Sequence, residues 1–289
     1  MKNIIFCGGD KRELYVMRAM IDQGYRVHAF GWPEELLPKE VLQVHSPVEA
    51  MKEADICILP QTPIKRDGQL LSLCDMPVFL RREELAALGD DTPILCGVAS
   101  PYLKYAAGHC RIFEMAENDT LALALAPASA EGAIAEAIRL SGSLLANSRA
   151  LLIGFGRIGR ELAWRLEGMG VDLVIMNRGK ARAEEAADMG YVVADRSQLV
   201  SAALHTDYIF NTAPAPLLDE LIIGLMDTDT CIIDLAAYPG GTDFAAAERR
   251  GIRAVHAGGL PGRYAPDYAG YKMAEFYTHL VASLLKKEG

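Results

Sequence analysis

Residues 150–159, Ala-Leu-Leu-Ile-Gly-Phe-Gly-Arg-Ile-Gly, decide the fold class. An apolar run typical of a buried strand leads into Gly154, Gly156 and Gly159, and a helical pattern follows. In this context the first glycine allows a tight turn, the second lets the backbone approach a pyrophosphate, and the third lets the helix pack on the strand. The sequence therefore predicts a Rossmann-type unit whose helix N-terminus faces the phosphates of a dinucleotide.

The residues after the next expected strand indicate which dinucleotide binds. Enzymes that prefer NAD place an acidic residue there to bind the ribose 2′-hydroxyl group. Here Asn177, Arg178 and Lys180 follow, so a 2′-phosphate group would meet cations. We therefore expect NADP as the cofactor; the alternative is that these are only solvated charges at the start of a helix. The expected cofactor-binding residues are Gly154, Phe155, Gly156, Arg157, Ile158, Gly159, Asn177, Arg178, Lys180, Thr212, Ala213, Pro214 and Leu235.

Short apolar runs alternate with helical patterns along most of the chain, as in parallel sheets covered by helices. We expect an α/β fold of two Rossmann-like, doubly wound parallel-sheet domains joined by a bridging helix, with an interdomain cleft. The expected boundaries are 1–125 for an N-terminal substrate or catalytic domain without the glycine pattern, 126–147 for the bridging helix, 148–268 for the NADP-binding domain, and 269–289 for a C-terminal helix packing back on the N-terminal domain. Pro127 and Ser129 are expected to start the main bridging helix.

The expected strands follow from the apolar runs. In the first domain they are 3–7, 25–30, 55–59, 77–80, 93–97 and 110–114. In the second domain they are 150–153, 171–176, 191–194, 208–211, 230–235 and 252–256.

Composition and charge exclude several function classes. The 289 residues carry a formal net charge of −9, from 29 Lys and Arg against 38 Asp and Glu, so no nucleic-acid partner is expected. The six cysteines are far apart and the histidines show no metal spacing, so no metal site is expected. No uninterrupted apolar run is long enough to span a membrane, and the start lacks a signal-peptide layout; we expect a cytoplasmic protein without membrane contacts.

Ligands of doubly wound sheets bind beyond the carboxyl ends of the strands. Loops rich in Gly, Pro and small residues occupy that position at 211–216, 234–243 and 257–266. His256 ends a strand there and is a candidate for proton transfer, the alternative being a structural histidine. In the first domain, Asp10 with Glu13 has the spacing of a capping box.

The chain resembles the family of dipicolinate synthase A-subunits. The resemblance is carried by Gly8-Gly9-Asp10 with Arg12, and by residues 99–103, 129–134, 154–159, 234–244 and 259–262, in the right order over nearly the whole length. One departure is Asp267-Tyr268, where the family has Lys-Thr. If that lysine holds a substrate carboxylate, Lys272 or Arg263 must replace it, or the substrate differs.

The resemblance implies an NADP-dependent oxidation of dihydrodipicolinate, or of its hydroxy-tetrahydro precursor, to pyridine-2,6-dicarboxylate during sporulation. It also implies a dicarboxylate substrate, a flavoprotein-like dipicolinate synthase B-subunit as partner, and the mother-cell cytoplasm as location. A homo-oligomer is expected as well. The candidate catalytic residues are His256, Thr242 and Ser129. The candidate substrate-binding residues are Asp10, Arg12, Ser100, Ser129, Glu131, Gly132, Gly241, Thr242 and Arg263.

Two other classes of function stay open. One is a different two-domain dehydrogenase. A 2-hydroxy-acid enzyme would need a paired His and acid, and a shikimate-type enzyme a Lys-Asp pair in the first domain; neither pair is evident in the sequence. The other is a non-catalytic NADP-binding sensor or scaffold subunit, which an assay for turnover would distinguish.

Overall fold

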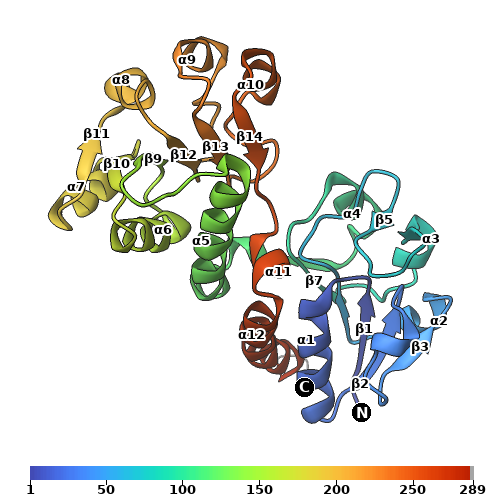
Figure 1. The fold of residues 1–289 in the computed structure, drawn as a ribbon. Helices are drawn as coiled ribbons and strands as arrows, with labels where there is room; N and C mark the ends of the chain where they lie inside the picture. Colours follow the sequence, from blue (N-terminus) through green and yellow to red (C-terminus); the bar gives the residue numbers. More distant parts are fainter. Residues whose placement is uncertain (287–289) are drawn as a thin grey trace. The chain divides into compact units, whose positions relative to one another are not determined.

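The computed structural model describes residues 1–286 and forms two compact units. Unit 1 combines Met1–Leu125 with the chain from Ala265 onward, and unit 2 is Ala126–Tyr264. Each unit contains a six-stranded sheet in which every neighbouring pair is parallel (Figure 1). The expected α/β fold of two Rossmann-like domains is therefore confirmed.

The sheet of unit 1 has the strand order β3-β2-β1-β4-β7-β8. The strands are β1 (Asn3–Cys7), β2 (Arg26–Phe30), β3 (Leu42–Val44), β4 (Ile56–Ile58), β7 (Pro93–Cys96) and β8 (Arg111–Glu114). The helices of this unit are α1 (Lys11–Asp22), η1 (Glu34–Leu36), α2 (Val48–Lys52), α3 (Arg82–Leu85), α4 (Pro101–Ala106), η2 (Met115–Glu117) and α12 (Pro266–Lys286). The order of the strands reverses between β1 and β4, which is the point where doubly wound sheets bind ligands.

Both faces of the unit 1 sheet are covered, which explains why its strands are apolar on both sides. Ile4 and Phe6 point to the face covered by α1 and α12, where Tyr277 is fully buried. Ile5 and Cys7 point to the other face, against residues of α2, α3 and α4. The alternation follows from the two-residue period of a strand.

For one strand of unit 1 the expected place in the parallel sheet is wrong. The run 77–80 contains β6 (Val78–Phe79), which pairs antiparallel with β5 (Gln69–Leu70) in a separate two-stranded sheet. The parallel sheet is completed instead by β3, which was not expected. It is a short edge strand whose Leu42 is exposed and whose Gln43 is half-buried, so it has no apolar run to reveal it.

The sheet of unit 2 has the equivalent order, β11-β10-β9-β12-β13-β14. Its strands are β9 (Arg149–Ile153), β10 (Asp172–Met176), β11 (Val192–Ala194), β12 (Tyr208–Asn211), β13 (Cys231–Asp234) and β14 (Arg253–His256). Every bound lies within one residue of the expected bound. The helices are α6 (Arg157–Gly168), α7 (Lys180–Asp188), η3 (Arg196–Gln198), α8 (Leu199–Ala203), α9 (Glu220–Leu225), α10 (Phe244–Arg250) and α11 (Leu260–Tyr264).

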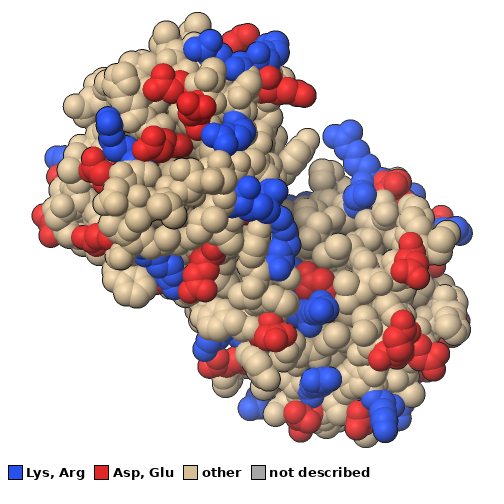
Figure 2. All heavy atoms as spheres, in the orientation of Figure 1, with Lys and Arg blue, Asp and Glu red and all other residues tan. Residues whose placement is uncertain are grey.

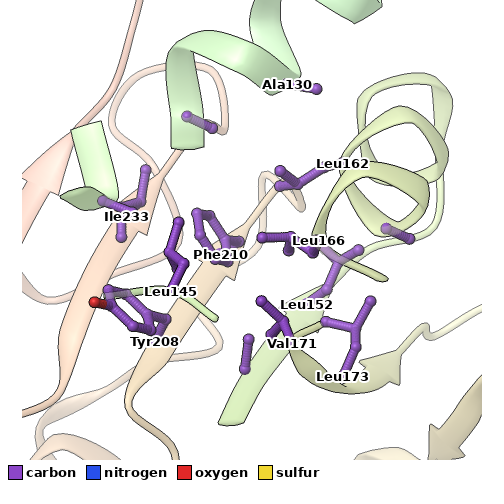
Figure 3. Packing of buried hydrophobic residues seen from close by; sticks show 14 of the residues in the cluster. Ala130, Leu145, Leu152, Leu162, Leu166, Val171, Leu173, Tyr208, Phe210 and Ile233 are labelled. Atoms are coloured by element: carbon purple, nitrogen blue, oxygen red, sulfur yellow. The ribbon is translucent and has the colours of Figure 1, made fainter. Parts of the chain in front are cut away.

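The core of unit 2 has the same two-sided arrangement. On one face Leu152 and Phe210 contact Leu162 and Leu166 of α6, with Ala130 of the long helix α5 close by (Figure 3). The alternate strand residues face residues of α8, α9 and α10. The loops that form the candidate site lie at the carboxyl edge of this sheet, between the two helix layers.

The helix α5 (Asp119–Ser141) starts earlier than expected, and Pro127 lies inside it rather than at its start. Asn118 begins the helix, because its side-chain Oδ1 accepts a hydrogen bond from the Leu121 amide (3.2 Å) and its carbonyl accepts one from the Ala122 amide (2.9 Å). Pro127 then removes one backbone donor from an otherwise continuous helix.

By length and composition alone, α5 is apolar enough to cross a membrane. Half of its most apolar window is buried, and Ala130, Ala133 and Ala137 belong to the core of unit 2. These contacts are those of a core helix.

Lys and Arg side chains are mixed with Asp and Glu over the face drawn in Figure 2, so this face shows no broad basic area.

Candidate functional site

The turn after β9 accepts only glycine at two of its positions. Gly154 has a φ of +97°, and a Cβ there would lie 2.3 Å from the hydroxyl of Thr212. A Cβ on Gly159 would lie 2.2 Å from the Gly154 carbonyl oxygen. Both distances are far below van der Waals contact, so any side chain would push α6 away from the sheet. The two glycines therefore let the turn and α6 pack closely against the ends of the neighbouring strands.

The N-terminus of α6 is open to an anion. Gly156 is the N-cap residue and has no side chain to cap the helix, so the positive end of the helix dipole is not offset by a capping side chain. A Cβ at Gly156 would lie 3.3 Å from Nη1 of Arg182, which places that guanidinium group next to the turn. Arg157 and Ile158, half-buried, form the first turn of the helix. The residues present fit the pyrophosphate of a dinucleotide.

Asn177 links the end of β10 to this turn. Its Oδ1 accepts a hydrogen bond from the amide of Phe155 (3.1 Å), and its Nδ2 donates to the carbonyl of Gly179 (2.8 Å). Arg178 and Lys180 are exposed beside it. The structure thus gives Asn177 a role in shaping the loop and leaves two cations at its surface.

The remaining expected cofactor residues lie at the ends of the neighbouring strands. The Thr212 hydroxyl donates to the carbonyl of Ile153 (3.0 Å), and the Leu235 amide donates to the carbonyl of Asn211 (2.7 Å). Ala213 and Pro214 continue from Thr212. The structure therefore brings the residues after β9, β10, β12 and β13 to one edge of the unit 2 sheet.

Asp234 is a buried carboxylate that holds the loop after β13. Its Oδ1 accepts hydrogen bonds from Nδ2 of Asn211 (3.1 Å) and the amide of Ala236 (3.0 Å). Its Oδ2 accepts from the amide of Gly241 (2.8 Å) and the hydroxyl of Thr242 (2.6 Å). The Thr242 hydroxyl proton is thereby committed to Asp234. This geometry favours a loop-holding role for Thr242 over proton transfer.

Gly241 also serves the shape of this loop, because a Cβ there would lie 2.3 Å from the carbonyl oxygen of Ala215. Asn211 and Asp234 were not among the expected site residues. The sequence does carry a signal for them, since each is the last, polar residue of an otherwise apolar strand.

His256 ends β14 and is held in one orientation. Its Nε2 lies 2.8 Å from the carbonyl oxygen of Ala236, and the rings of Tyr238 and Phe244 meet it edge-on. A carbonyl oxygen only accepts hydrogen bonds, so Nε2 carries the proton, and Nδ1 of the neutral ring keeps a lone pair. His256 can therefore accept a proton at Nδ1.

The expected residues on α5 lie against α11 or on the surface. Ser129 is buried, and Glu131 is exposed and pairs with Arg165 at 3.4 Å. A Cβ on Gly132 would lie 2.9 Å from Cβ of Leu260, so this glycine allows the two helices to pack closely. Glu131 and Gly132 thus have roles in the surface and packing of unit 2.

Arg263 pairs with Glu136, a buried residue that was not among the expected site residues. Burial alone would raise the pKa of Glu136. Hydrogen bonds from Arg139 and Tyr264 and the charge of Arg263 outweigh it, so the pKa lies below its ordinary value. In this structure Arg263 therefore has a carboxylate partner inside its own unit.

The expected residues of unit 1 include two helix caps. Ser100 accepts a hydrogen bond from the amide of Leu103 (3.2 Å) at the start of α4. Asp10 caps α1 and also binds the buried Arg12 through two oxygens, at 2.9 Å to Nε and 2.7 Å to Nη2. Asp10 and Arg12 thus lie together at the carboxyl end of β1, and Ser100 lies near that of β7.

From the sequence, Glu13 was expected only to cap a helix. The structure makes it a candidate functional residue of unit 1. Its Oε2 accepts from the amide of Asp10 (2.8 Å), whereas its buried Oε1 has no hydrogen-bond partner among residues 1–286. Burial, followed by the charge of Asp10, raises the pKa of Glu13 to about 7. A buried carboxyl group that holds a proton near neutral pH marks this end of the sheet as a candidate site.

The Asp267-Tyr268 departure has a structural role in unit 1. The Tyr15 hydroxyl donates to Asp267 (2.7 Å), and the Tyr268 hydroxyl donates to the carbonyl of Ala124 (3.0 Å). Lys272, the other suggested replacement for the missing lysine, pairs with Glu275 at 3.1 Å.

In the described part of the chain, no three His, Cys, Asp or Glu side chains come together in a way that could hold a metal ion.

Comparisons with known proteins agree with this geometry. The family model for the N-terminal domain of the dipicolinate synthase A-subunit matches residues 3–115, and the model "D-isomer specific 2-hydroxyacid dehydrogenase, NAD binding domain" matches residues 124–236. The dipicolinate synthase A-subunit of Bacillus subtilis (strain 168) is 28% identical, over 99% of this chain and 98% of its own length.

Solved structures extend the likeness to three dimensions. The crystal structure of the dipicolinate synthase A-subunit from Bacillus halodurans has a TM-score of 0.91 at 25% identity and covers 97% of this chain and 98% of that one. A transhydrogenase from Sinorhizobium meliloti, with a TM-score of 0.68 at 15% identity over 98% of this chain and 95% of its own, shares the fold. The chain is a dehydrogenase-type subunit with a nicotinamide-dinucleotide-binding domain. The resemblance is confirmed along nearly the whole chain, which is similar in sequence and in fold to dipicolinate synthase A-subunits.

Proposed function

We propose that this chain oxidises dihydrodipicolinate, or its hydroxy-tetrahydro precursor after loss of water, to pyridine-2,6-dicarboxylate, with NADP as the hydride acceptor. The observation that carries the proposal is the turn after β9. It offers a close backbone approach and an uncapped helix N-terminus, and Arg178 and Lys180 are exposed at the end of the next strand. A 2′-phosphate group would meet these two cations, which supports NADP over NAD.

The dinucleotide, when bound, supplies the acceptor for the hydride that leaves the ring of the substrate. The substrate also loses one proton, and we assign its removal to Nδ1 of His256, because Nε2 is already held by the carbonyl of Ala236. Formation of the aromatic ring drives this loss, so a weak base is sufficient. Asp234 and Thr242 act by fixing the loop beside His256. Ser129 stays a candidate for contact with the substrate.

We further propose the setting of this activity. The Bacillus subtilis relative is named as the A-subunit of a synthase, which supports a partner B-subunit for this chain. The proposed setting is a homo-oligomer in the mother-cell cytoplasm of a sporulating bacterium. Binding of the substrate by the N-terminal domain is part of the same proposal.

A coupled assay tests the reaction. Dihydrodipicolinate is generated in place from pyruvate and aspartate semialdehyde by its synthase, the protein is added with NADP, and NADPH and the pyridine product are followed together. Equal appearance of both products is the expected result. Turnover that requires the B-subunit would make the chain one half of a two-component enzyme. Binding of NADP without turnover under either condition would favour the sensor or scaffold function.

A matched pair of proteins, the wild type and one variant, tests the proton acceptor. In His256→Gln the amide nitrogen can still donate to the Ala236 carbonyl, but the side chain no longer offers a basic nitrogen. We expect kcat to fall by about 100-fold, within the range of general base catalysis, while NADP binding is unchanged. An unchanged kcat would remove His256 from the mechanism and leave the assigned reaction intact.

A further inference from the structure

The carboxyl edge of the unit 1 sheet holds a buried polar cluster at its switch point. Arg12 and Glu13 follow β1, Trp32 follows β2, Gln61 follows β4, and Tyr277 of α12 packs over them. A doubly wound sheet binds its ligands at this position. No phosphate group is expected here, because Asp10 and Glu13 already cap α1 with their carboxyl groups.

The cluster contains hydrogen-bonding atoms that the protein itself does not satisfy. Nε1 of Trp32 and Oε1 of Glu13 are buried and have no partner within residues 1–286. The hydroxyl oxygen of Tyr277 accepts a hydrogen bond from Nε2 of Gln61 (3.0 Å). Within residues 1–286 this is its hydrogen bond, so the hydroxyl proton of Tyr277 is available to donate to a ligand. Burial raises the pKa of Tyr277 far above its ordinary value, so this proton stays in place.

Gly9 shows that two of these groups are neighbours. A Cβ placed on Gly9 would lie 2.6 Å from Cζ2 of Trp32 and 3.0 Å from Cγ of Glu13. Its φ of +140° is accessible to glycine and strained for other residues. The indole and the carboxyl group therefore meet at one backbone position where no side chain intervenes.

We propose that this cluster is a carboxylate-binding subsite, in which Trp32 Nε1, the Tyr277 hydroxyl and the protonated Glu13 donate hydrogen bonds to one carboxylate group of a small ligand. The identification of that ligand as the dicarboxylate substrate rests on the proposed function. A carboxylate has about four acceptor positions, and the cluster offers unpaired donors rather than acceptors. Unpaired buried donors are costly, and a bound acceptor would remove that cost.

Charge makes this binding depend on protonation. The groups that face Glu13 are Asp10 and Arg12 beside it and Tyr277 on α12. With Glu13 protonated, the charges of Asp10 and Arg12 cancel and the cluster is neutral. With Glu13 ionised, the cluster is negative and has lost one donor. The raised pKa of Glu13, about 7, places this change near neutral pH, and a carboxylate should bind better on the acid side.

The two tryptophans of the chain make the test selective. Trp164 is 64% exposed on α6 of unit 2, and Trp32 is 2% exposed inside the cluster. In Trp164→Phe, Trp32 is the single tryptophan and reports on its own surroundings. This variant is titrated with pyridine-2,6-dicarboxylate, without dinucleotide, at about pH 6 and about pH 8.

We expect a saturable change in Trp32 fluorescence, with an affinity several-fold weaker at about pH 8 than at about pH 6. Adding Glu13→Gln should keep binding and abolish its pH dependence, because the amide is a neutral donor throughout. Adding Tyr277→Phe should weaken binding by about five- to tenfold, the loss of one hydrogen bond. Tyr25→Phe, a half-buried tyrosine of unit 1 outside the cluster, is the matched control and should change nothing.

Melting curves of every variant establish that it is folded. The absence of a saturable Trp32 response at both pH values overturns the subsite, and so does a response that Glu13→Gln and Tyr277→Phe leave unchanged. NADPH binding and turnover are measured on the same proteins. If these are intact while Trp32 is silent, the subsite fails and the proposed function stands. If Trp32 responds while turnover is absent both with and without the B-subunit, the subsite stands and the proposed function fails.

Discussion

The two units share one strand order and differ in how they use the turn after the first strand. In unit 2, α6 begins at Gly156 without a side-chain cap. In unit 1, α1 begins at Asp10, whose carboxylate accepts from the Arg12 amide, while Glu13 accepts from the Asp10 amide. The same topology therefore yields a phosphate site only where the helix N-terminus is not already satisfied by the protein's own carboxylates.

The residues that follow the second strand of each unit also differ in charge. β10 is followed by Asn177 and Arg178, and β2 by Trp32 and then by Glu34 and Glu35. Unit 2 thus presents cations where a nucleotide would place its ribose, and unit 1 presents an indole and acids. On one shared framework, unit 2 therefore has the features of a dinucleotide site and unit 1 has those of the proposed carboxylate subsite.

The largest effect is expected when unit 2 is given the N-terminus of unit 1. Gly156→Asp would cap α6 and place a carboxylate beside Arg182, where the pyrophosphate is expected. Dinucleotide affinity should fall by at least about 100-fold, measured by calorimetry, while the free energy of unfolding stays within about 1 kcal/mol. Gly156→Asn is the neutral control of similar size and should lose less affinity. Equal losses in both variants would show that size, rather than charge, decides the site.

A second effect is expected in unit 1, from Glu13→Gln. The pKa of Glu13 rises from 4.5 to about 7 on folding, so between these values the folded state binds more protons than the unfolded state. The free energy of unfolding should therefore fall as pH rises from about 4.5 to about 7, by on the order of 2 kcal/mol, and then level off. Glu13→Gln should remove this fall.

Urea unfolding of unit 1, followed through Trp32 in a Trp164→Phe background, measures the effect at each pH. Glu117→Gln, which changes an exposed glutamate of the same unit, is the control and should keep the dependence. If the slope with pH survives in Glu13→Gln, the buried carboxyl group is not its source.

The smallest effect concerns the ribose end of unit 2. Arg178→Glu gives this loop an acid in place of a cation, so NADP affinity should fall by about tenfold or more while NAD affinity changes little. Titrations with each dinucleotide measure the ratio. Arg196→Glu makes the same charge change at another exposed position of unit 2 and should leave the ratio unchanged. An equal response of NADP and NAD to Arg178→Glu would contradict the assignment of the 2′-phosphate site.

The parts of the fold that the sequence predicted are those in which the local pattern carries the constraint. The strands of unit 2 are buried on both faces and stand out as apolar runs. The glycines at 154 and 159 are required by the backbone itself. By contrast, β3 is short and exposed. Pro127 was expected to start a helix because proline favours the first turn, and the N-cap signal of Asn118, nine residues earlier, was missed.

The site was harder to predict because its polar residues are defined by distant partners. Arg263 resembles a free cation until the fold brings it to Glu136, 127 residues away. Thr242 resembles a free hydroxyl until Asp234 takes its proton. Conversely, Glu13 has the pattern of an ordinary cap, and its pKa is raised first by burial, in surroundings that include Tyr277 of the distant helix α12.

The composition of unit 1 from two distant stretches has a consequence for synthesis on the ribosome. Met273, Tyr277, Val281 and Leu284 of α12 complete the core around β1 and α1, yet they are translated after the whole of unit 2. Unit 2 is one continuous stretch and can fold as it emerges. Unit 1 therefore starts before unit 2 and is finished after it, and its apolar surface must be covered by a chaperone until α12 has been made.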